Sequence, residues 1–196
     1  AFDTLPGQEL TTEEAMRLVG DRKAWRAIFS DNYPELVEEG FAWPEGPTWI
    51  EEDKSLIFSD TITGKLHQYK DGTITLLKEH AGGCTVNVDG GCDDEQLEPG
   101  SNGMAIVGDK IAVCQHGARR LAFLDLATMN EELIVDKHGR ARLNGPNDVV
   151  ATPDALYFTD PYYALLEKRR PADASYADDK SELGFAGVYR YDLGTR

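Results

Sequence analysis

Short strand-like runs come in groups along most of this chain, and this repetition limits the folds that it can adopt. From Phe41 onward, runs rich in Val, Ile, Phe, Tyr and Thr alternate with turns of Gly, Asp and Pro, as is typical of an all-β protein. Two groups of four and one group of three are recognisable. The expected strands are Thr48–Ile50, Ser55–Ser59, Lys65–Tyr69 and Ile74–Lys78; then Met104–Val107, Lys110–Cys114, Arg120–Asp125 and Glu132–Val135; then Val149–Ala151, Ala155–Thr159 and Gly187–Asp192.

A repeat of about 40–50 residues that holds four strands is typical of the blades of a β-propeller, in which the innermost strand of each blade lines a central channel. Three residues fall at equivalent positions before the first strand of each group, namely Glu45, Asn102 and Asn147. We therefore expect their side chains to converge on the axis. Carboxylate and carboxamide oxygens are ligands of hard cations, so this pattern predicts part of a divalent-cation site.

The same three residues also have structural interpretations. Glu45 can form a salt bridge at a loop instead of binding a metal ion. The Asn147-Asp148 pair and the Ser-Asn-Gly that contains Asn102 are both common turn sequences. Asn102 has a further interpretation, as a residue that contacts metal-bound water or the substrate.

A second set of polar residues recurs just past the second strand of each group: Asp60, His116 and Asp160. For Asp60 and Asp160, this recurrence favours a shared role in the turns of the blades over a role in catalysis. His116 has two interpretations. It can be a satisfied structural histidine, or it can orient a substrate or shuttle a proton.

The chain before Phe41 has a different pattern. Residues 11–30 are predicted to be helical, since Thr11 or Thr12 can cap the start and apolar residues recur at helical spacing, with a break near Gly20. We therefore divide the chain into an N-terminal helical extension, residues 1–40, and a partial propeller, residues 41–196. Two polar inserts, HAGGCTVNVDGGCDDEQLEPG and LLEKRRPADASYADDKSEL, are predicted to be surface loops.

The bulk composition excludes some classes of partner. With 20 Lys and Arg against 35 Asp and Glu, the formal net charge of −15 repels nucleic acids and anionic lipids. No stretch approaches the length of a membrane span, and no basic-then-apolar signal sequence opens the chain, although its first residue is alanine and a leader or fragment is a possible origin. We expect a soluble protein, cytoplasmic or secreted.

Three cysteines leave the redox compartment open. Cys84 and Cys92 flank one polar loop and either form a disulfide or remain two free thiols. Cys114 lies in the apolar run IAVC and is predicted to be a small core residue.

Seven motifs follow one another from Phe41 to the end of the chain: WPEGPTW, LIFSD, EPGSNGM, VCQHGARRL, RLNGPNDVV, LYFTDPYY and GVYRYD. As an ordered set they resemble the gluconolactonase, senescence marker protein (regucalcin) and luciferin-regenerating enzyme family, in its gluconolactonase-like branch. The resemblance implies a six-bladed β-propeller with Ca²⁺, or another divalent cation such as Zn²⁺, Mg²⁺ or Mn²⁺, on its axis. It also implies hydrolysis of small sugar-acid lactones such as gluconolactone.

The resemblance further assigns residues. The Glu of EGP is Glu45 and the Asn of PND is Asn147, and both are implied to be metal ligands; Asn102 of SNG and His116 of CQH match positions of the substrate pocket. The family's later motifs, Pro-Asn-Gly and Pro-Asp-Gly, carry another Asn ligand and an Asp that can activate water. Neither occurs before Arg196, so we expect about three blades, with the general base beyond the end of the chain.

Three functions remain open at this point: a Ca²⁺-dependent lactonase, a non-catalytic propeller that binds Ca²⁺ or a partner, and a phosphotriesterase-like or strictosidine synthase-like relative. Three blades leave an open first and last edge, with unpaired strand amides and exposed apolar surface. This predicts that the piece alone is either poorly soluble or self-associates through those edges.

Overall fold

The computed structural model describes residues 35–83, 96–166 and 180–194, and the chain divides into two compact units, Ala1–Val37 and Glu38–Arg196. All the helices and strands given below belong to the second unit. The helix predicted over residues 11–30 lies outside the described residues, as does the Cys84–Cys92 loop.

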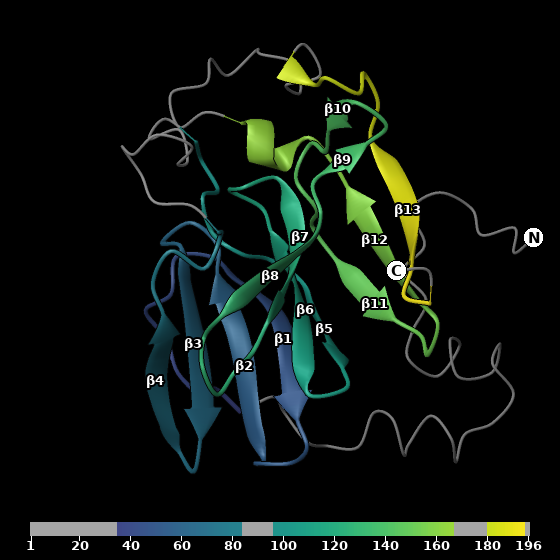
Figure 1. Cartoon of the computed structure of the whole chain (residues 1–196). Coiled ribbons are helices and arrows are strands. Elements are labelled where there is room, and N and C mark those ends of the chain that lie inside the picture. The colour runs from purple at the N-terminus through teal and green to yellow at the C-terminus, as the bar shows by residue number, and fades with distance from the viewer. Residues whose placement is uncertain (1–34, 84–95, 167–179, 195–196) are drawn as a thin grey trace, which may run out of the picture. The chain divides into compact units, whose positions relative to one another are not determined.

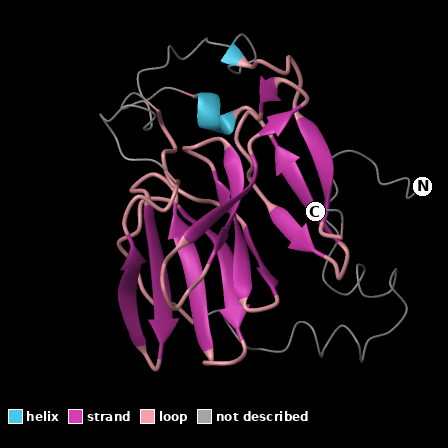
Figure 2. Cartoon of the chain, in the orientation of Figure 1, coloured by secondary structure: helices cyan, strands magenta, loops and turns pink. Residues whose placement is uncertain are grey.

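Within the described residues, the second unit is built from three antiparallel sheets of three or four strands and one two-stranded sheet, and almost all of its regular structure is strand (Figures 1 and 2). In each sheet the strands follow one another in chain order, which is the arrangement of a propeller blade. The first blade comprises β1 (Pro44–Ile50), β2 (Ser55–Asp60), β3 (Lys65–Lys70) and β4 (Thr73–Lys78); the second comprises β5 (Met104–Val107), β6 (Lys110–Gln115), β7 (Arg120–Leu124) and β8 (Glu131–Val135); the third comprises β11 (Val149–Ala151), β12 (Ala155–Asp160) and β13 (Gly187–Asp192).

Each predicted strand is present, and the all-β partial propeller is confirmed. The first strand begins earlier than predicted, at Pro44 rather than Thr48, because a β-bulge between Glu45 and Thr48 absorbs Gly46 and Pro47. Gly46 has a φ of 57°, a left-handed conformation that suits glycine. Proline and a left-handed glycine are signals against a strand, so the sequence pattern did not predict the first residues of β1.

A small hairpin and one helical turn were not predicted. The hairpin joins β9 (Lys137–His138) to β10 (Ala141–Arg142) between the second and third blades, and the 3-10 helix η1 (Tyr163–Leu165) follows β12. Strands of two residues in a polar segment carry no period-2 pattern, so the sequence gives no strand signal there.

The second blade is buried on both faces, and β6 shows this most clearly. Ile111 and Val113 belong to a core cluster shared with the first blade, whereas Ala112 and Cys114 belong to a cluster shared with the third. Successive side chains of a strand point to opposite faces, so one strand joins two cores. Cys114 is free and buried, as predicted.

The outer blades expose apolar side chains. Trp49 and Leu76 of the first blade are 48% and 47% exposed, and Val150 and Val188 of the third are 58% and 75% exposed. Exposed apolar surface of this kind is where another sheet or chain can pack. Self-association through the open edges stays a prediction.

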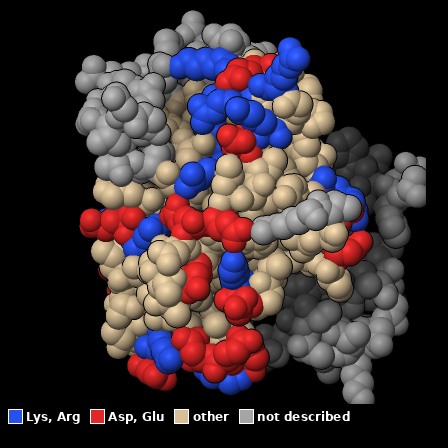
Figure 3. Space-filling model, viewed as in Figure 1, with Lys and Arg blue, Asp and Glu red and all other residues tan. Residues whose placement is uncertain are grey.

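On the face seen in Figure 3, basic side chains lie among acidic ones. Within the described ranges, no helix has both the length and the apolar character needed to cross a membrane.

Candidate functional site

The first strands of the three blades, β1, β5 and β11, meet through their backbones (Figure 1). A Cβ atom added to Gly46 would lie 2.4 Å from the carbonyl oxygen of Asn102, and one added to Gly103 would lie 2.7 Å from the Cα of Asp148. The Gly103 N–H donates to the Asn147 carbonyl at 2.8 Å. The absence of a side chain at these two glycines is what lets neighbouring blades approach so closely.

This approach brings two of the predicted site residues together. The Nδ2 of Asn102, a residue that is only 4% exposed, donates to the Oδ1 of Asn147 at 3.0 Å. Their backbones are fixed as well, since Asn102 N–H donates to Cys114 O and Asn147 N–H donates to Thr159 O, both at 2.9 Å. The structure therefore brings two of the three residues of the repeat register into contact.

Glu45 lies at the same end of the first blade, opposite Ser59 of β2. Its side chain is half-buried and accepts a hydrogen bond from Trp43 Nε1 at 3.1 Å. Within the described residues, no hydrogen bond joins Glu45 to Asn102 or Asn147. Its charge nevertheless reaches into the site, because it helps to raise the pKa of Glu98.

His116 is fully buried beside Glu98, with 3.4 Å between Nε2 and the Oε2 of Glu98. In the part of the chain that the structure describes, neither imidazole nitrogen has a hydrogen-bond partner of good geometry. Burial lowers the pKa of His116 to about 4, against an opposing effect of the Pro146 backbone. His116 is therefore neutral at pH 7.

Glu98 is a residue of this site that the sequence analysis missed. Burial, and then the charge of Glu45, raise the pKa of its carboxyl group. It lies between the first and second blades, outside the repeat register that identified the other residues. The available signal was its place in the EPGSNGM motif, only four residues before Asn102.

The two aspartates that share the repeat position of His116 have a structural role, as predicted. Asp60 accepts hydrogen bonds from the backbone N–H groups of Ala42 at 3.1 Å and Trp43 at 2.8 Å. Asp160 accepts them from Asn144 at 2.9 Å and Gly145 at 2.7 Å. Each carboxylate thus ties the end of the second strand to the segment that enters its blade.

The oxygen donors at this end suit a hard cation in kind. Glu45 offers a carboxylate, and Asn147 a carboxamide oxygen that can accept the Asn102 hydrogen bond and still bind a cation through its second lone pair. Ca²⁺ takes about six to eight oxygen ligands, so these residues supply part of a coordination shell. Across the described ranges, no group of three or more His, Cys, Asp or Glu residues is placed to hold a metal ion.

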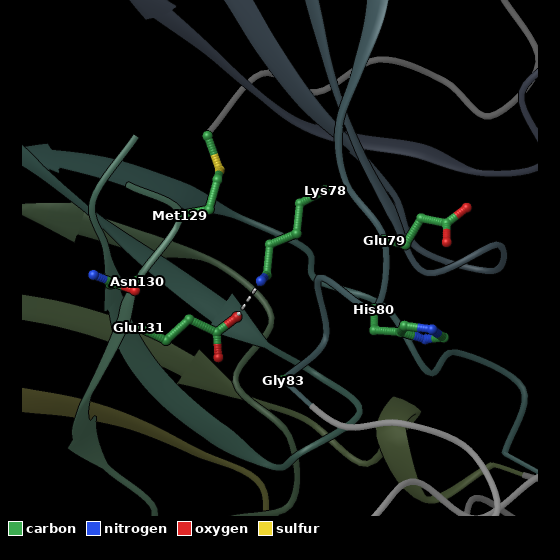
Figure 4. Close-up of a pocket in the computed structure, with 7 residues that line it drawn as sticks. All are labelled: Lys78, Glu79, His80, Gly83, Met129, Asn130 and Glu131. Atoms are coloured by element: carbon green, nitrogen blue, oxygen red, sulfur yellow. Dashed lines mark ion pairs between the residues drawn. The ribbon is translucent and has the colours of Figure 1, made fainter. Parts of the chain in front are cut away.

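A cavity of about 430 Å³ lies elsewhere, between the end of β4 and the segment that enters β8 (Figure 4). Lys78 and Glu131 form an ion pair across it, with 3.3 Å between Nζ and Oε1. None of the predicted site residues lines this cavity. It is therefore separate from the end of the blades where the two carboxamides meet.

Comparison with known proteins gives a consistent result. Residues 43–196 match the family model described as the SMP-30/Gluconolactonase/LRE-like region. A gluconolactonase of Zymomonas mobilis is 31% identical over 159 residues, which cover 80% of this chain and 42% of that protein.

Comparison with solved structures points to the same family. The structure of a gluconolactonase from Xanthomonas campestris has a TM-score of 0.62 at 28% identity, covering 81% of this chain and 46% of that one. Another X-ray structure from the gluconolactonase family has a TM-score of 0.63 at 25% identity, covering 83% and 51%. The chain thus spans about half the length of the relatives that it matches.

Proposed function

Because the chain belongs to the SMP-30/gluconolactonase/LRE-like family, we propose that it acts in the hydrolysis of small sugar-acid lactones such as gluconolactone. The observation that carries this proposal is the contact between Asn102 and Asn147 where the first strands of two blades meet. Glu45 lies on β1 of the first blade, next to Gly46, which packs on the backbone of Asn102.

We further propose that Glu45 and Asn147 hold a divalent cation, with Ca²⁺ the first candidate because both ligands are oxygen donors. When bound, such a cation polarises the lactone carbonyl and stabilises the developing oxyanion. One carboxylate with neutral carboxamides leaves the ion with net positive charge, which suits this chemistry. Further ligands are needed to complete the coordination shell.

The remaining residues position the reactants in this proposal. Asn102 is held by its backbone and by Asn147, so its carboxamide can orient the lactone at a fixed place. His116 lies fully buried at the same end of the second blade, and its imidazole is neutral at pH 7. A buried, pre-positioned polar group costs little reorganisation when substrate binds.

Hydrolysis of gluconolactone with and without a chelator tests the proposal. We expect the rate to fall to the uncatalysed level after metal removal and to return when Ca²⁺ is restored. Glu45→Gln is expected to weaken Ca²⁺ binding by at least tenfold. The matched control is Glu51→Gln, the same change at an exposed glutamate, which should leave Ca²⁺ binding unchanged.

Each outcome of this test has a defined meaning. Equal rates with and without chelator contradict the metal site. Ca²⁺ binding without turnover contradicts the enzyme proposal and identifies a non-catalytic Ca²⁺-binding module instead. Full Ca²⁺ affinity in Glu45→Gln removes Glu45 from the ligand set.

A further inference from the structure

We propose that Trp43 is a stacking platform, on which the ring of a sugar lactone lies with its C–H face against the indole. This inference rests on the proposed hydrolysis of sugar-acid lactones and names a residue that binds their ring. A sugar lactone carries hydroxyl groups around its edge and C–H groups on its faces. A flat aromatic ring beside oxygen-bearing side chains suits both parts of such a ligand.

Trp43 borders the candidate site. Its Nε1 donates to the Oε1 of Glu45 at 3.1 Å. Glu45 lies opposite Ser59 in the pairing of β1 with β2, and the Ser59 hydroxyl donates to the carbonyl of Asn102 at 2.9 Å. Asn102 in turn contacts Asn147. The indole is therefore next to the polar groups to which the lactone is proposed to bind.

The indole is accessible to a ligand. Trp43 is 52% exposed, and it precedes β1, so the open face of the first blade does not account for its exposure. That face does account for the exposure of Trp49. Ile50 packs in the core shared with the second blade, and Trp49, its neighbour in the strand, points to the opposite face.

The ring of Trp43 is held in place before a ligand binds. The Trp43 N–H donates to the Oδ1 of Asp60 at 2.8 Å, and the Trp43 carbonyl accepts from the N–H of Thr61 at 3.1 Å. The bond from Nε1 to Glu45 then fixes the far end of the side chain. A tryptophan side chain has only two torsion angles, so little freedom remains to be lost when another ring stacks on it.

A second contact of the same kind in β1 provides an internal control. Trp49 Nε1 donates to the Oε2 of Glu51 at 2.7 Å, just as Trp43 donates to the glutamate two residues later. Trp49 is 48% exposed, nearly the same as Trp43. It lies at the end of β1 away from Glu45, beside the turn where Glu51 pairs with Lys54. The two indoles thus differ in their distance along β1 from the candidate site.

Proton NMR of gluconolactam, the unreactive lactam analogue of gluconolactone, tests the stacking in the presence of Ca²⁺. An aromatic ring shifts protons that lie over its face to higher field. We therefore expect the ring C–H protons of gluconolactam to move upfield with the wild-type protein. The shift should be lost in Trp43→Ala and in Trp43→Leu, which keeps an apolar side chain without a ring. It should be kept in Trp43→Phe and in Trp49→Ala.

Steady-state kinetics on gluconolactone provide a second measurement. We expect Trp43→Ala to raise KM about tenfold while kcat stays within about twofold, since a stacked ring binds the ground state and the transition state alike. Trp43→Phe should stay within about threefold of the wild-type KM, because the phenyl ring keeps a stacking face without the N–H. Trp49→Ala should keep the wild-type KM.

Each outcome decides between defined alternatives. The absence of an upfield shift with the wild-type protein, an equal shift in Trp43→Leu, or an unchanged KM in Trp43→Ala would overturn the proposal. Equal losses in Trp43→Phe and Trp43→Ala would also overturn it, and would show that Trp43 acts by holding Glu45 through its N–H. If the wild-type protein opens no lactone while the shift of gluconolactam depends on Trp43, the proposed function fails and the stacking platform stands.

Discussion

The position at the end of the second strand of each blade is occupied in two ways. Two blades hold an aspartate that binds backbone N–H groups there, and one holds a histidine that does not. In the first and third blades this position holds Asp60 and Asp160, each of which accepts two backbone hydrogen bonds from the segment entering its blade. In the second blade it holds His116, which faces Glu98 and, among the described residues, accepts no backbone hydrogen bond of good geometry at its imidazole. A residue that departs from the role of its repeat partners is thus a candidate for function.

The two aspartates also differ from each other. Burial opposes ionisation of both, but the hydrogen bonds from Trp43 and Ala42 outweigh it and lower the pKa of Asp60. Around Asp160 burial dominates, and its pKa is raised in spite of two backbone bonds and the charge of Arg119. The same bonding pattern therefore gives opposite pKa shifts when the depth of burial changes.

The largest expected effect comes from removing the deeper anchor. Asp160→Ala leaves the buried N–H groups of Asn144 and Gly145 without their acceptor and should lower the free energy of unfolding by about 4 kcal/mol. Asp60→Ala should cost less, because Ala42 and Trp43 are exposed and water can replace the carboxylate. Urea unfolding measures both, with Asp160→Asn as a control that keeps one acceptor oxygen. Equal losses in the two alanine variants would break the comparison.

The next effect is a dependence on pH. Folding lowers the pKa of His116 from 6.5 to about 4, so the unfolded chain binds a proton there that the folded chain does not. Between those values, the contribution of His116 to the free energy of unfolding should fall as pH decreases, by about 3 kcal/mol in total.

The measurement compares the wild-type protein with His116→Gln in urea unfolding at pH 7, 5.5 and 4.5. We expect the difference between them to shrink or reverse toward low pH. A constant difference would show that His116 is not a buried neutral group. Because Glu98 and Asp160 have raised pKa values of their own, only the difference between the two proteins isolates His116.

The smallest expected effect on stability comes from adding a side chain at a glycine where the first strands of the blades meet. Gly103→Ala places a Cβ atom against the backbone of Asp148 and should cost about 2 kcal/mol by overpacking. Gly108→Ala, at an open turn with a φ of 61°, should cost about 1 kcal/mol from backbone strain alone.

Ca²⁺ affinity, measured by calorimetry, adds a second readout. Gly103→Ala should weaken it because the strand that carries Asn102 is displaced from Asn147, and Gly108→Ala should not. Equal affinities in the two variants would contradict a cation site at the axis.

Most of the fold was predictable because its signals are local and periodic. Turn residues separate short apolar runs, and each run becomes a strand of a meander such as β6 or β12. The errors arose where local signals oppose the fold. Pro44 and Gly46 belong to β1 only because a bulge accommodates them, and β9 and β10 are too short to show a period.

The site was predictable in part, for a related reason. Asn102 and Asn147 were found because equivalent positions of a repeat converge in space, and the structure does bring them into contact. Glu98 has no equivalent in the repeat, since its position depends on a connecting segment that packs against His116. No periodicity can report a contact of this kind, and only the three-dimensional arrangement reveals it.

The glycine contacts at the axis restrict where this protein can vary. Where β1, β5 and β11 meet, main-chain atoms touch main-chain atoms, so the spacing of the blades does not depend on the size of any side chain at Gly46 or Gly103. Exchange of residues elsewhere on these strands leaves that spacing intact. Residues at other positions of these strands are therefore free to change while the spacing at the inner end stays the same.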